Sequence, residues 1–257
     1  MCKEIAAPKG KAGGENPAES EVGSFVLCRL VETVFIEGVS NTREIGGFLG
    51  LGGKTVRRGA IYRGAYLDDV TEQGKRFARE VLGIRTDLDL RNGGEGSADD
   101  ALSPLGEGVK HILRPGCMYT GNKWGGLTHV GRVGIDIPEG ARKLVDELLV
   151  FADSDNYPIY VHCVLGRDRT GTLIAALLAL VGVGEDDIML DYKLSFFSQK
   201  GELEGTNIPR VIGYFEAVLE YIKGFGGDTL VENAERFLLQ SGLSKEAIAA
   251  IRQNVLE

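Results

Sequence analysis

The segment from Pro158 to Val181 constrains the fold most, because its pattern changes from strand to loop to helix within a short length. It begins with the apolar run Pro158-Ile-Tyr-Val-His162, which predicts a short buried strand. After a tight loop, a mostly apolar stretch from Arg169 or Thr170 to Val181 predicts a buried helix. A strand that enters a helix through such a loop is typical of α/β proteins.

Strand and helix patterns alternate along the rest of the chain, and the second half is mainly helical. Strands are expected at 56–62, 84–90 and 109–113, and helices at 71–82, 138–152, 185–197, 209–222, 229–239 and 244–256. Thr71 and Ser244 are expected N-caps, and Pro138 suits a helix start. This order predicts an α/β fold whose central, mostly parallel sheet is flanked by helices, with a helical C-terminal part.

Composition sets apart an N-terminal tail and an internal loop. Residues 1–23 are rich in Gly, Pro, Ala, Glu and Lys, which predicts a disordered or loosely attached tail before a single domain at 24–257. The glycine-rich stretch 115–136 contains Trp124, the only tryptophan, and is expected to form a functional loop.

The charge and hydropathy of the chain exclude several classes of partner. The formal net charge is -8, from 29 Lys+Arg against 37 Asp+Glu, which argues against nucleic-acid binding. No stretch approaches the ~20 apolar residues of a membrane span, so no stable membrane insertion is expected. The basic N-terminal residues lack a following apolar run, which favours a cytoplasmic protein, with secretion left open. An anionic substrate must therefore be attracted locally.

The loop Cys163-Val-Leu-Gly-Arg-Asp-Arg169 has the composition of an anion site. Backbone N–H groups from Val164 to Arg169 can surround one oxyanion, and the next helix directs its positive N-terminal end to the same place. Gly166 permits the tight turn, and Arg169 can contact two phosphate oxygens. The same positive potential lowers the pKa of a cysteine from ~8.5, which favours the nucleophilic thiolate at Cys163.

Neighbouring residues have a functional and a plainer interpretation each. Thr170 can offer its hydroxyl to the sulfur or only cap the helix. His162 can bind the backbone of the nucleophile or be a satisfied strand-end histidine. Arg167 can reach a second phosphate or an acidic group, or be a solvated surface charge. Cys163 itself would be an inert buried cysteine only if its neighbours Gly166, Arg169 and Thr170 were coincidental.

His162-Cys-Val-Leu-Gly-Arg-Asp-Arg-Thr-Gly171 resembles the HCx5R signature of the protein tyrosine phosphatase superfamily. Its Asp-Arg-Thr-Gly ending is similar to the atypical bacterial and fungal branch, which includes mycobacterial protein tyrosine phosphatase B. Further resemblances occur in the family's order, over roughly residues 30–200: Asn41-Thr-Arg-Glu-Ile-Gly-Gly47, Val56-Arg-Arg-Gly59 with Tyr62-Arg-Gly-Ala65, Asp89-Leu-Arg91, and Asp191-Tyr192 with Ser195.

The resemblance implies a phosphotyrosine-phosphatase-like fold and hydrolysis of phosphomonoesters through a phosphocysteine at Cys163, with no metal and no cofactor. The binding loop would comprise Val164, Leu165, Gly166, Arg167 and Thr170, with Arg169 as the catalytic arginine. The substrate would be a phosphorylated protein (phosphotyrosine or dual specificity) or a phosphoinositide; neither this choice nor the oligomeric state follows from the sequence. The side chains of Arg43, Glu44, Arg63 and Arg91 are expected to tie loops together.

A phosphatase also needs an acid that protonates the leaving oxygen. Asp168 is the first candidate, because a bound dianion beside it would raise its pKa, and the resembling branch carries an aspartate there. Asp89, at a strand end, is the second candidate and Asp136 the third; for both, a structural or solvated carboxylate is the favoured interpretation.

Two other functions compete with hydrolysis. A catalytically silent phosphate-binding pseudophosphatase would keep the loop, but the joint presence of Cys163, Asp168 and Arg169 argues against it. A rhodanese-like sulfurtransferase also has a cysteine loop, which the Asp-Arg-Thr-Gly ending fits poorly. Cys117 is either a disulfide partner for an oxidised Cys163 or, preferably, a free thiol.

Overall fold

The computed structural model describes residues 34–116, 134–198 and 207–257. All of these lie in one compact unit, Val31–Glu257. The expected tail at 1–23 and most of the expected loop at 115–136, with Cys117 and Trp124, lie outside the described residues.

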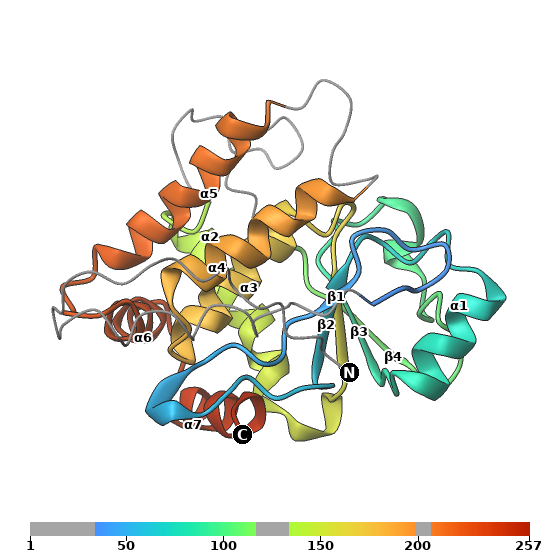
Figure 1. Cartoon of the computed structure of the whole chain (residues 1–257), viewed down its shortest axis with the longest axis horizontal. Coiled ribbons are helices and arrows are strands. Elements are labelled where there is room, and N and C mark those ends of the chain that lie inside the picture. Colours follow the sequence, from blue (N-terminus) through green and yellow to red (C-terminus); the bar gives the residue numbers. More distant parts are fainter. Residues whose placement is uncertain (1–33, 117–133, 199–206) are drawn as a thin grey trace, which may run out of the picture. The chain divides into compact units, whose positions relative to one another are not determined.

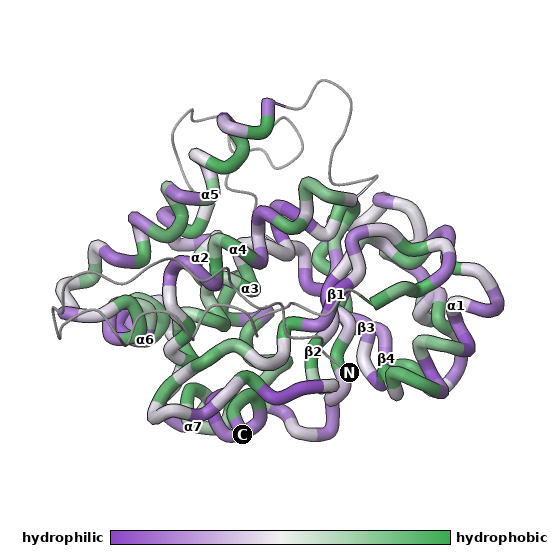
Figure 2. The backbone as a smooth tube through the Cα atoms, viewed as in Figure 1, coloured by the Kyte–Doolittle hydropathy of each residue, from purple (hydrophilic) through white to green (hydrophobic). Residues whose placement is uncertain are grey.

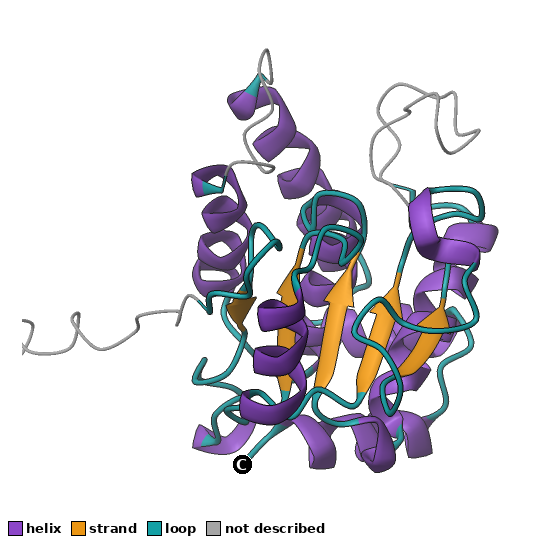
Figure 3. Ribbon diagram, turned by 90° about the vertical axis from the view of Figure 1, so that its right-hand side faces the viewer, coloured by secondary structure: helices purple, strands orange, loops and turns teal. Residues whose placement is uncertain are grey.

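A five-stranded sheet forms the centre of the unit (Figure 1). Its strands are β1 (Arg43–Glu44), β2 (Ile61–Gly64), β3 (Thr86–Asp89), β4 (Lys110–Leu113) and β5 (Ile159–His162), in the spatial order β1-β2-β5-β3-β4. Only β1 is antiparallel to its neighbour, and the other four strands run in the same direction (Figure 3). The predicted mostly parallel sheet is thus confirmed, with β5 at its middle.

Seven α-helices surround this sheet in the described part of the chain: α1 (Glu72–Arg76), α2 (Pro138–Leu148), α3 (Asp168–Leu180), α4 (Glu185–Leu194), α5 (Ile208–Lys223), α6 (Leu230–Gln240) and α7 (Lys245–Val255). Two predicted caps are present: Thr71 Oγ1 accepts the N–H of Gly74 at 3.1 Å, and Ser244 Oγ accepts that of Ala247 at 3.1 Å. The helical C-terminal part is confirmed.

The expected strand at 56–62 is only partly correct. Gly59 adopts a left-handed φ of +67° and turns the chain, so β2 begins at Ile61. Val56 instead forms an isolated bridge with Leu256 next to the C-terminus. The two-residue strand β1 was not predicted, because a pair of charged residues carries no strand pattern.

The two faces of the sheet bury different side chains. On β5, Ile159 and Val161 enter the larger apolar core, which includes α3, whereas Tyr160 faces a smaller core that includes Ala78, just after α1. Almost every residue of α3 is buried, and the helix is apolar on all sides from Leu173 onward. Figure 2 shows the hydropathy of the chain along the backbone. Helix α3 contacts α2, α4, α5 and α6, so it is packed on several sides.

Alternation along the strands also gathers polar residues on one face. His162 follows Tyr160 by two positions, and Asp87 and Asp89 alternate with the apolar Leu88 on β3. The register pairs Asp87 with Tyr160 and Asp89 with His162. These charged side chains therefore lie together, under the edge where the parallel strands end and the Cys163 loop begins.

Candidate active site

The loop between β5 and α3 has a conformation that only glycine permits at its centre. Gly166 adopts a φ of +64°, and a Cβ there would overlap the carbonyl oxygen of Gly64 at the end of β2. The carbonyl oxygens of Leu165 and Gly166 accept the amide of Asn41 at 2.9 and 3.1 Å, and Arg63 Nη2 donates to Gly166 at 2.8 Å. The C=O and N–H of a trans peptide point in opposite directions. Hydrogen bonds that hold these carbonyl groups toward Asn41 and Arg63 therefore direct the N–H groups of the same peptides away from Asn41 and Arg63.

A buried ion-pair cluster fixes these anchors from α4. Arg43 Nε lies 2.7 Å from Asp191 Oδ1, and Arg63 Nη1 contacts Asp191 Oδ2. Arg43 also donates to Asn41 Oδ1 at 2.6 Å and to Ser195 Oγ at 3.1 Å. Burial raises the pKa of Asp191, but the two guanidinium groups outweigh it and lower the pKa below its usual value. The motif Asp191 with Ser195 thus supports the loop indirectly.

Cys163 is buried at the start of the loop, with 3% of its surface exposed. Burial alone would raise the pKa of its thiol, but the charge of Arg169 and hydrogen bonding from Thr170 outweigh it and lower the pKa. Thr170 Oγ1 is buried and has no nitrogen or oxygen partner within the described residues, so helix capping does not occupy it. The arrangement favours a thiolate at Cys163.

Arg169 is almost fully buried, and its guanidinium is held in position by a residue that the sequence analysis missed. Nη1 lies 2.7 Å from Glu95 Oε2 and 3.2 Å from Leu90 O, and Nη2 lies 3.3 Å from Glu95 Oε1. Burial alone would raise the pKa of Glu95, but the hydrogen bond from Arg169, with the backbone N–H of Asn92, outweighs burial and lowers the pKa below its usual value. The sequence offered one indication of this role, because Glu95 follows the end of β3 and Cys163 follows the end of the neighbouring strand β5.

Arg167 and Asp168 form an ion pair with each other, with Arg167 Nε 2.9 Å from Asp168 Oδ1. The guanidinium also lies 5.5 Å from the ring centre of Phe196, and only 7% of Arg167 is exposed. The alternative of a solvated surface charge at Arg167 is therefore wrong. Asp168 is the first residue of α3. It is close enough to Cys163 for its negative charge to raise the pKa of the thiol, against the lowering by Arg169 and Thr170.

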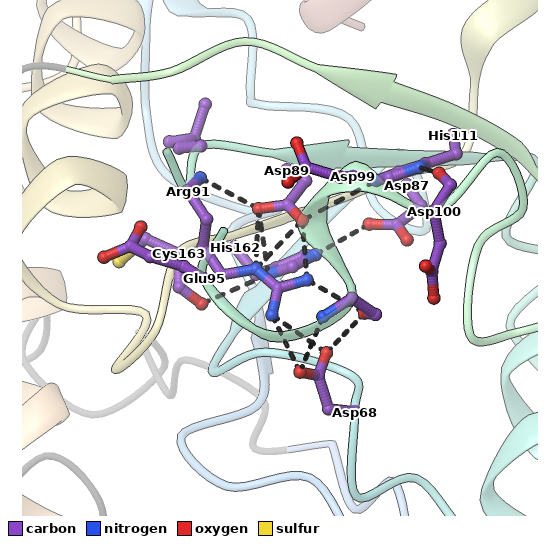
Figure 4. A network of polar contacts seen from close by, with 12 residues as sticks. Asp68, Asp87, Asp89, Arg91, Glu95, Asp99, Asp100, His111, His162 and Cys163 are labelled. Carbon is purple, nitrogen blue, oxygen red and sulfur yellow. Dashed lines mark hydrogen bonds and ion pairs between the residues drawn. The ribbon is translucent and has the colours of Figure 1, made fainter. Parts of the chain in front are cut away.

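Asp89 is bound to Arg91 through both carboxylate oxygens (Figure 4). Arg91 also contacts Asp68 at 2.9 Å, and His111 Nε2 lies 3.6 Å from Asp89. Burial raises the pKa of Asp89, but His162 and Arg91 outweigh it and lower the pKa. A carboxylate held ionised by these partners is a poor proton donor, so the geometry argues against Asp89 as the acid and supports the structural interpretation.

The remaining predicted residues occupy distinct places. His162 is fully buried, with Nδ1 3.1 Å from the carbonyl oxygen of Cys163 and Nε2 2.9 Å from Asp87 Oδ1. Asp136 precedes α2 and lies close enough to α5 to add to the raised pKa of Tyr221, which is mainly due to burial. Val164 is anchored through its carbonyl oxygen, which accepts the N–H of Tyr66 at 3.2 Å.

Within the described ranges, no group of three or more His, Cys, Asp or Glu side chains is arranged to hold a metal ion. In those same ranges, no helix is both long and apolar enough to cross a membrane. The described site itself brings together a cysteine whose surroundings favour the thiolate, an arginine, a carboxylate and backbone N–H groups at the start of a helix.

Several known proteins are similar to this chain. The profile of a tyrosine phosphatase family matches residues 34–257. A Cupriavidus necator protein, whose name assigns it provisionally to the tyrosine-protein phosphatases, is 28% identical over 187 residues, or 68% of this chain and 67% of that protein. A provisionally named Yarrowia lipolytica tyrosine-protein phosphatase, OCA1, is 31% identical over 84 residues, or 30% of this chain and 33% of its own length. The catalytic core of the S. cerevisiae PP-IP phosphatase SIW14 is 20% identical, with a TM-score of 0.41, over 61% of this chain and 79% of that one.

Proposed function

The chain belongs to the tyrosine phosphatase family, and from this premise we propose that it hydrolyses phosphomonoesters through a phosphocysteine intermediate on Cys163. The observation that carries the proposal is the lowered pKa of a buried Cys163 at the mouth of a loop whose carbonyl groups are held outward. A thiolate in that position can attack a phosphorus atom bound by the N–H groups of the loop.

In the first step, the Cys163 sulfur forms a bond to phosphorus while the bond to the ester oxygen breaks. Arg169 and the N–H groups of the loop hold the three non-bridging oxygens, and the proton for the leaving oxygen comes from Asp168. In the second step, Asp168 takes a proton from water, whose oxygen attacks phosphorus and releases the sulfur as a thiolate. The hydrogen-bonding groups of Thr170 stabilise that leaving thiolate.

The assignment of Asp168 carries one requirement. The side chain is ion-paired with Arg167 at 2.9 Å, so Arg167 has to release it before it can hold a proton. A bound phosphate dianion supplies the reason, because it attracts Arg167 and raises the pKa of a neighbouring carboxyl group. Asp168 and Arg167 are thus proposed to act together when substrate binds.

The substrate is proposed to be a phosphorylated protein, with phosphotyrosine or dual specificity, or a phosphoinositide. Phosphate release from a panel of phosphopeptides and phosphoinositides would rank these classes directly. A clear preference for phosphoinositides over every peptide would place the protein among lipid phosphatases. Binding of both classes without phosphate release would instead favour the silent phosphate-binding module.

The test of the mechanism is hydrolysis of p-nitrophenyl phosphate in the presence of EDTA. The Cys163→Ser variant is expected to lose activity by at least about 1,000-fold, because an alcohol is a far weaker nucleophile than a thiolate at neutral pH. Asp168→Asn is expected to slow an alkyl phosphate, a poor leaving group, much more than p-nitrophenyl phosphate. Activity that survives Cys163→Ser would exclude the phosphocysteine, and equal slowing of both substrates would exclude Asp168 as the acid.

A further inference from the structure

Asp87 is a fully buried carboxylate that the proposed mechanism does not use. It lies on β3, and its Oδ1 is 2.9 Å from Nε2 of His162, the residue before the nucleophile (Figure 4). Its other oxygen, Oδ2, accepts the hydroxyl of Ser103 at 2.7 Å. The Ser103 oxygen in turn accepts the N–H of Leu105 at 3.1 Å, so its single proton is directed to Asp87. Oδ2 of Asp87 is therefore placed as an acceptor.

The two nitrogens of the His162 ring both face acceptors. Nδ1 lies 3.1 Å from the carbonyl oxygen of Cys163, which has no proton to donate, and Nε2 faces the Asp87 carboxylate. A neutral imidazole carries only one N–H and would leave one of these contacts without a proton. Nε2 and Asp87 Oδ1 make no hydrogen bond of good geometry among the described residues, but their separation of 2.9 Å is that of an ion pair. Together with the contact of Nδ1, this distance favours the doubly protonated imidazolium form of His162.

The groups around the ring agree with this protonation state. Asp89 Oδ1 lies 3.8 Å from Nδ1, Arg91 is bound to Asp89, and the Tyr160 ring is 5.8 Å from the imidazole centre. Burial alone lowers the pKa of His162, but Asp87 and then Asp89 outweigh burial and Arg91, and raise the pKa to about 9. Asp87 makes the largest favourable contribution, because Asp89 is already engaged by Arg91.

We infer that Asp87 is a positioning residue that keeps His162 as an imidazolium, which holds the Cys163 carbonyl and leaves a positive charge beside the nucleophile. The inference rests on the proposed function of Cys163 and adds a residue from another strand to it. A carboxylate at Asp87 lets Nδ1 and Nε2 both carry protons, so the ring cannot switch tautomers and release the carbonyl oxygen. Without that carboxylate, a fully buried histidine is expected to become neutral, since burial disfavours the charged form.

The direct test replaces the charge but not the shape of Asp87, in the full-length Asp87→Asn variant. Alkylation of Cys163 by iodoacetamide as a function of pH reports the thiolate, and the ring ¹⁵N shifts of His162 report its protonation. We expect one unprotonated His162 nitrogen at pH 7.5 in the variant, and a thiolate midpoint higher by about one pH unit. For hydrolysis, kcat/KM of the variant relative to wild type should fall about 10-fold at a pH below both thiolate midpoints, and less than about 3-fold at a pH above both.

A matched control is Asp155→Asn, which removes an exposed carboxylate from the turn before β5 and should leave the thiolate midpoint unchanged. A doubly protonated His162 in Asp87→Asn, or an unchanged thiolate midpoint, would overturn the inference. If the variant does not fold, the wild-type protein decides: a single unprotonated His162 nitrogen at pH 7.5 would contradict the imidazolium. Alkylation and ¹⁵N shifts need no turnover, so they can fail or succeed independently of the proposed hydrolysis.

Discussion

Asp191→Asn should reveal how strongly the phosphate loop depends on the ion-pair cluster beneath it. Asp191 and its partners Arg43 and Arg63 are each at most 2% exposed in their side chains. The amide keeps the shape of the carboxylate but removes its charge, which leaves two buried guanidinium groups with no counter-charge from α4. Breaking a buried ion pair by removing one partner costs about 3–5 kcal/mol, so we expect a loss of about 3 kcal/mol or more in the free energy of unfolding.

The physical cause also sets the pH dependence of this loss. Arg43 and Arg63 hold the pKa of Asp191 below its unfolded value, so the carboxylate contributes stability above that unfolded value, and the contribution disappears as the pH falls through the folded pKa. Wild type and Asp191→Asn should therefore differ most at neutral pH and converge in acid. Because Arg63 also donates to the Gly166 carbonyl, phosphate binding should weaken with stability.

Urea unfolding followed by circular dichroism at pH 7 and at about pH 2.5, which is below the unfolded pKa of ~3.9 for Asp, measures the loss of stability and its pH dependence. Asp186→Asn is the matched control, because it makes the same chemical change at an exposed position of α4 and should cost less than about 1 kcal/mol. A loss below about 1 kcal/mol for Asp191→Asn at pH 7 would refute the reasoning, since it would mean that the two arginines need no buried carboxylate.

Two further predictions concern the loop and its base. Gly166→Ala should abolish phosphate binding and lower stability, because the new Cβ overlaps the Gly64 carbonyl and φ is +64°. Gly184→Ala is the control: it has open space at φ -68°, and although it changes the N-cap of α4, it should alter the free energy of unfolding by less than about 1 kcal/mol in urea. Equal effects of the two substitutions would contradict this. Burial raises the pKa of Glu147 well above 4.5. As the pH rises from 4.5 toward that raised pKa, the free energy of unfolding of wild type should therefore fall by up to ~1.4 kcal/mol per pH unit relative to Glu147→Gln. A stability difference that is the same at pH 5 and pH 7 would contradict a proton on Glu147.

Local pattern was enough to predict the fold class, because the decisive elements carry their signals in short stretches. The β5 strand, the loop and α3 follow one another directly, and Thr71 caps its helix as its position suggested. Helix and strand ends were less predictable. The helix expected at 71–82 continues past α1 as a π-helical turn, Phe77–Val81, whose hydrogen bonds depend on backbone packing rather than on residue type.

The residues that escaped prediction act through contacts between distant strands. Asp87 looks like an ordinary polar residue of an alternating strand, and its meaning depends on the register that brings it beside His162. Glu95 follows a strand end in a glycine-rich turn, where an exposed carboxylate would be the usual expectation. Glu147 lies buried on α2, although glutamate is rarely buried without a partner. No spacing along the chain identifies such residues, because the sheet topology creates their contacts.

The charges around the loop explain how an acidic protein with a net charge of -8 can hold an anion. Each arginine of the loop already has a carboxylate partner, Arg167 with Asp168 and Arg169 with Glu95. In the proposed function, a phosphate group would therefore have to share or displace those carboxylates. The attraction that remains uncompensated would come from the loop N–H groups and the N-terminal end of α3. These dipoles are fixed in direction and range, so they favour a tetrahedral dianion seated in the loop over anions that merely approach the surface. On this proposal, selectivity for phosphate follows from the shape of the backbone around Gly166, because a weakly bound anion would not displace the carboxylates of Glu95 and Asp168 from their arginine partners.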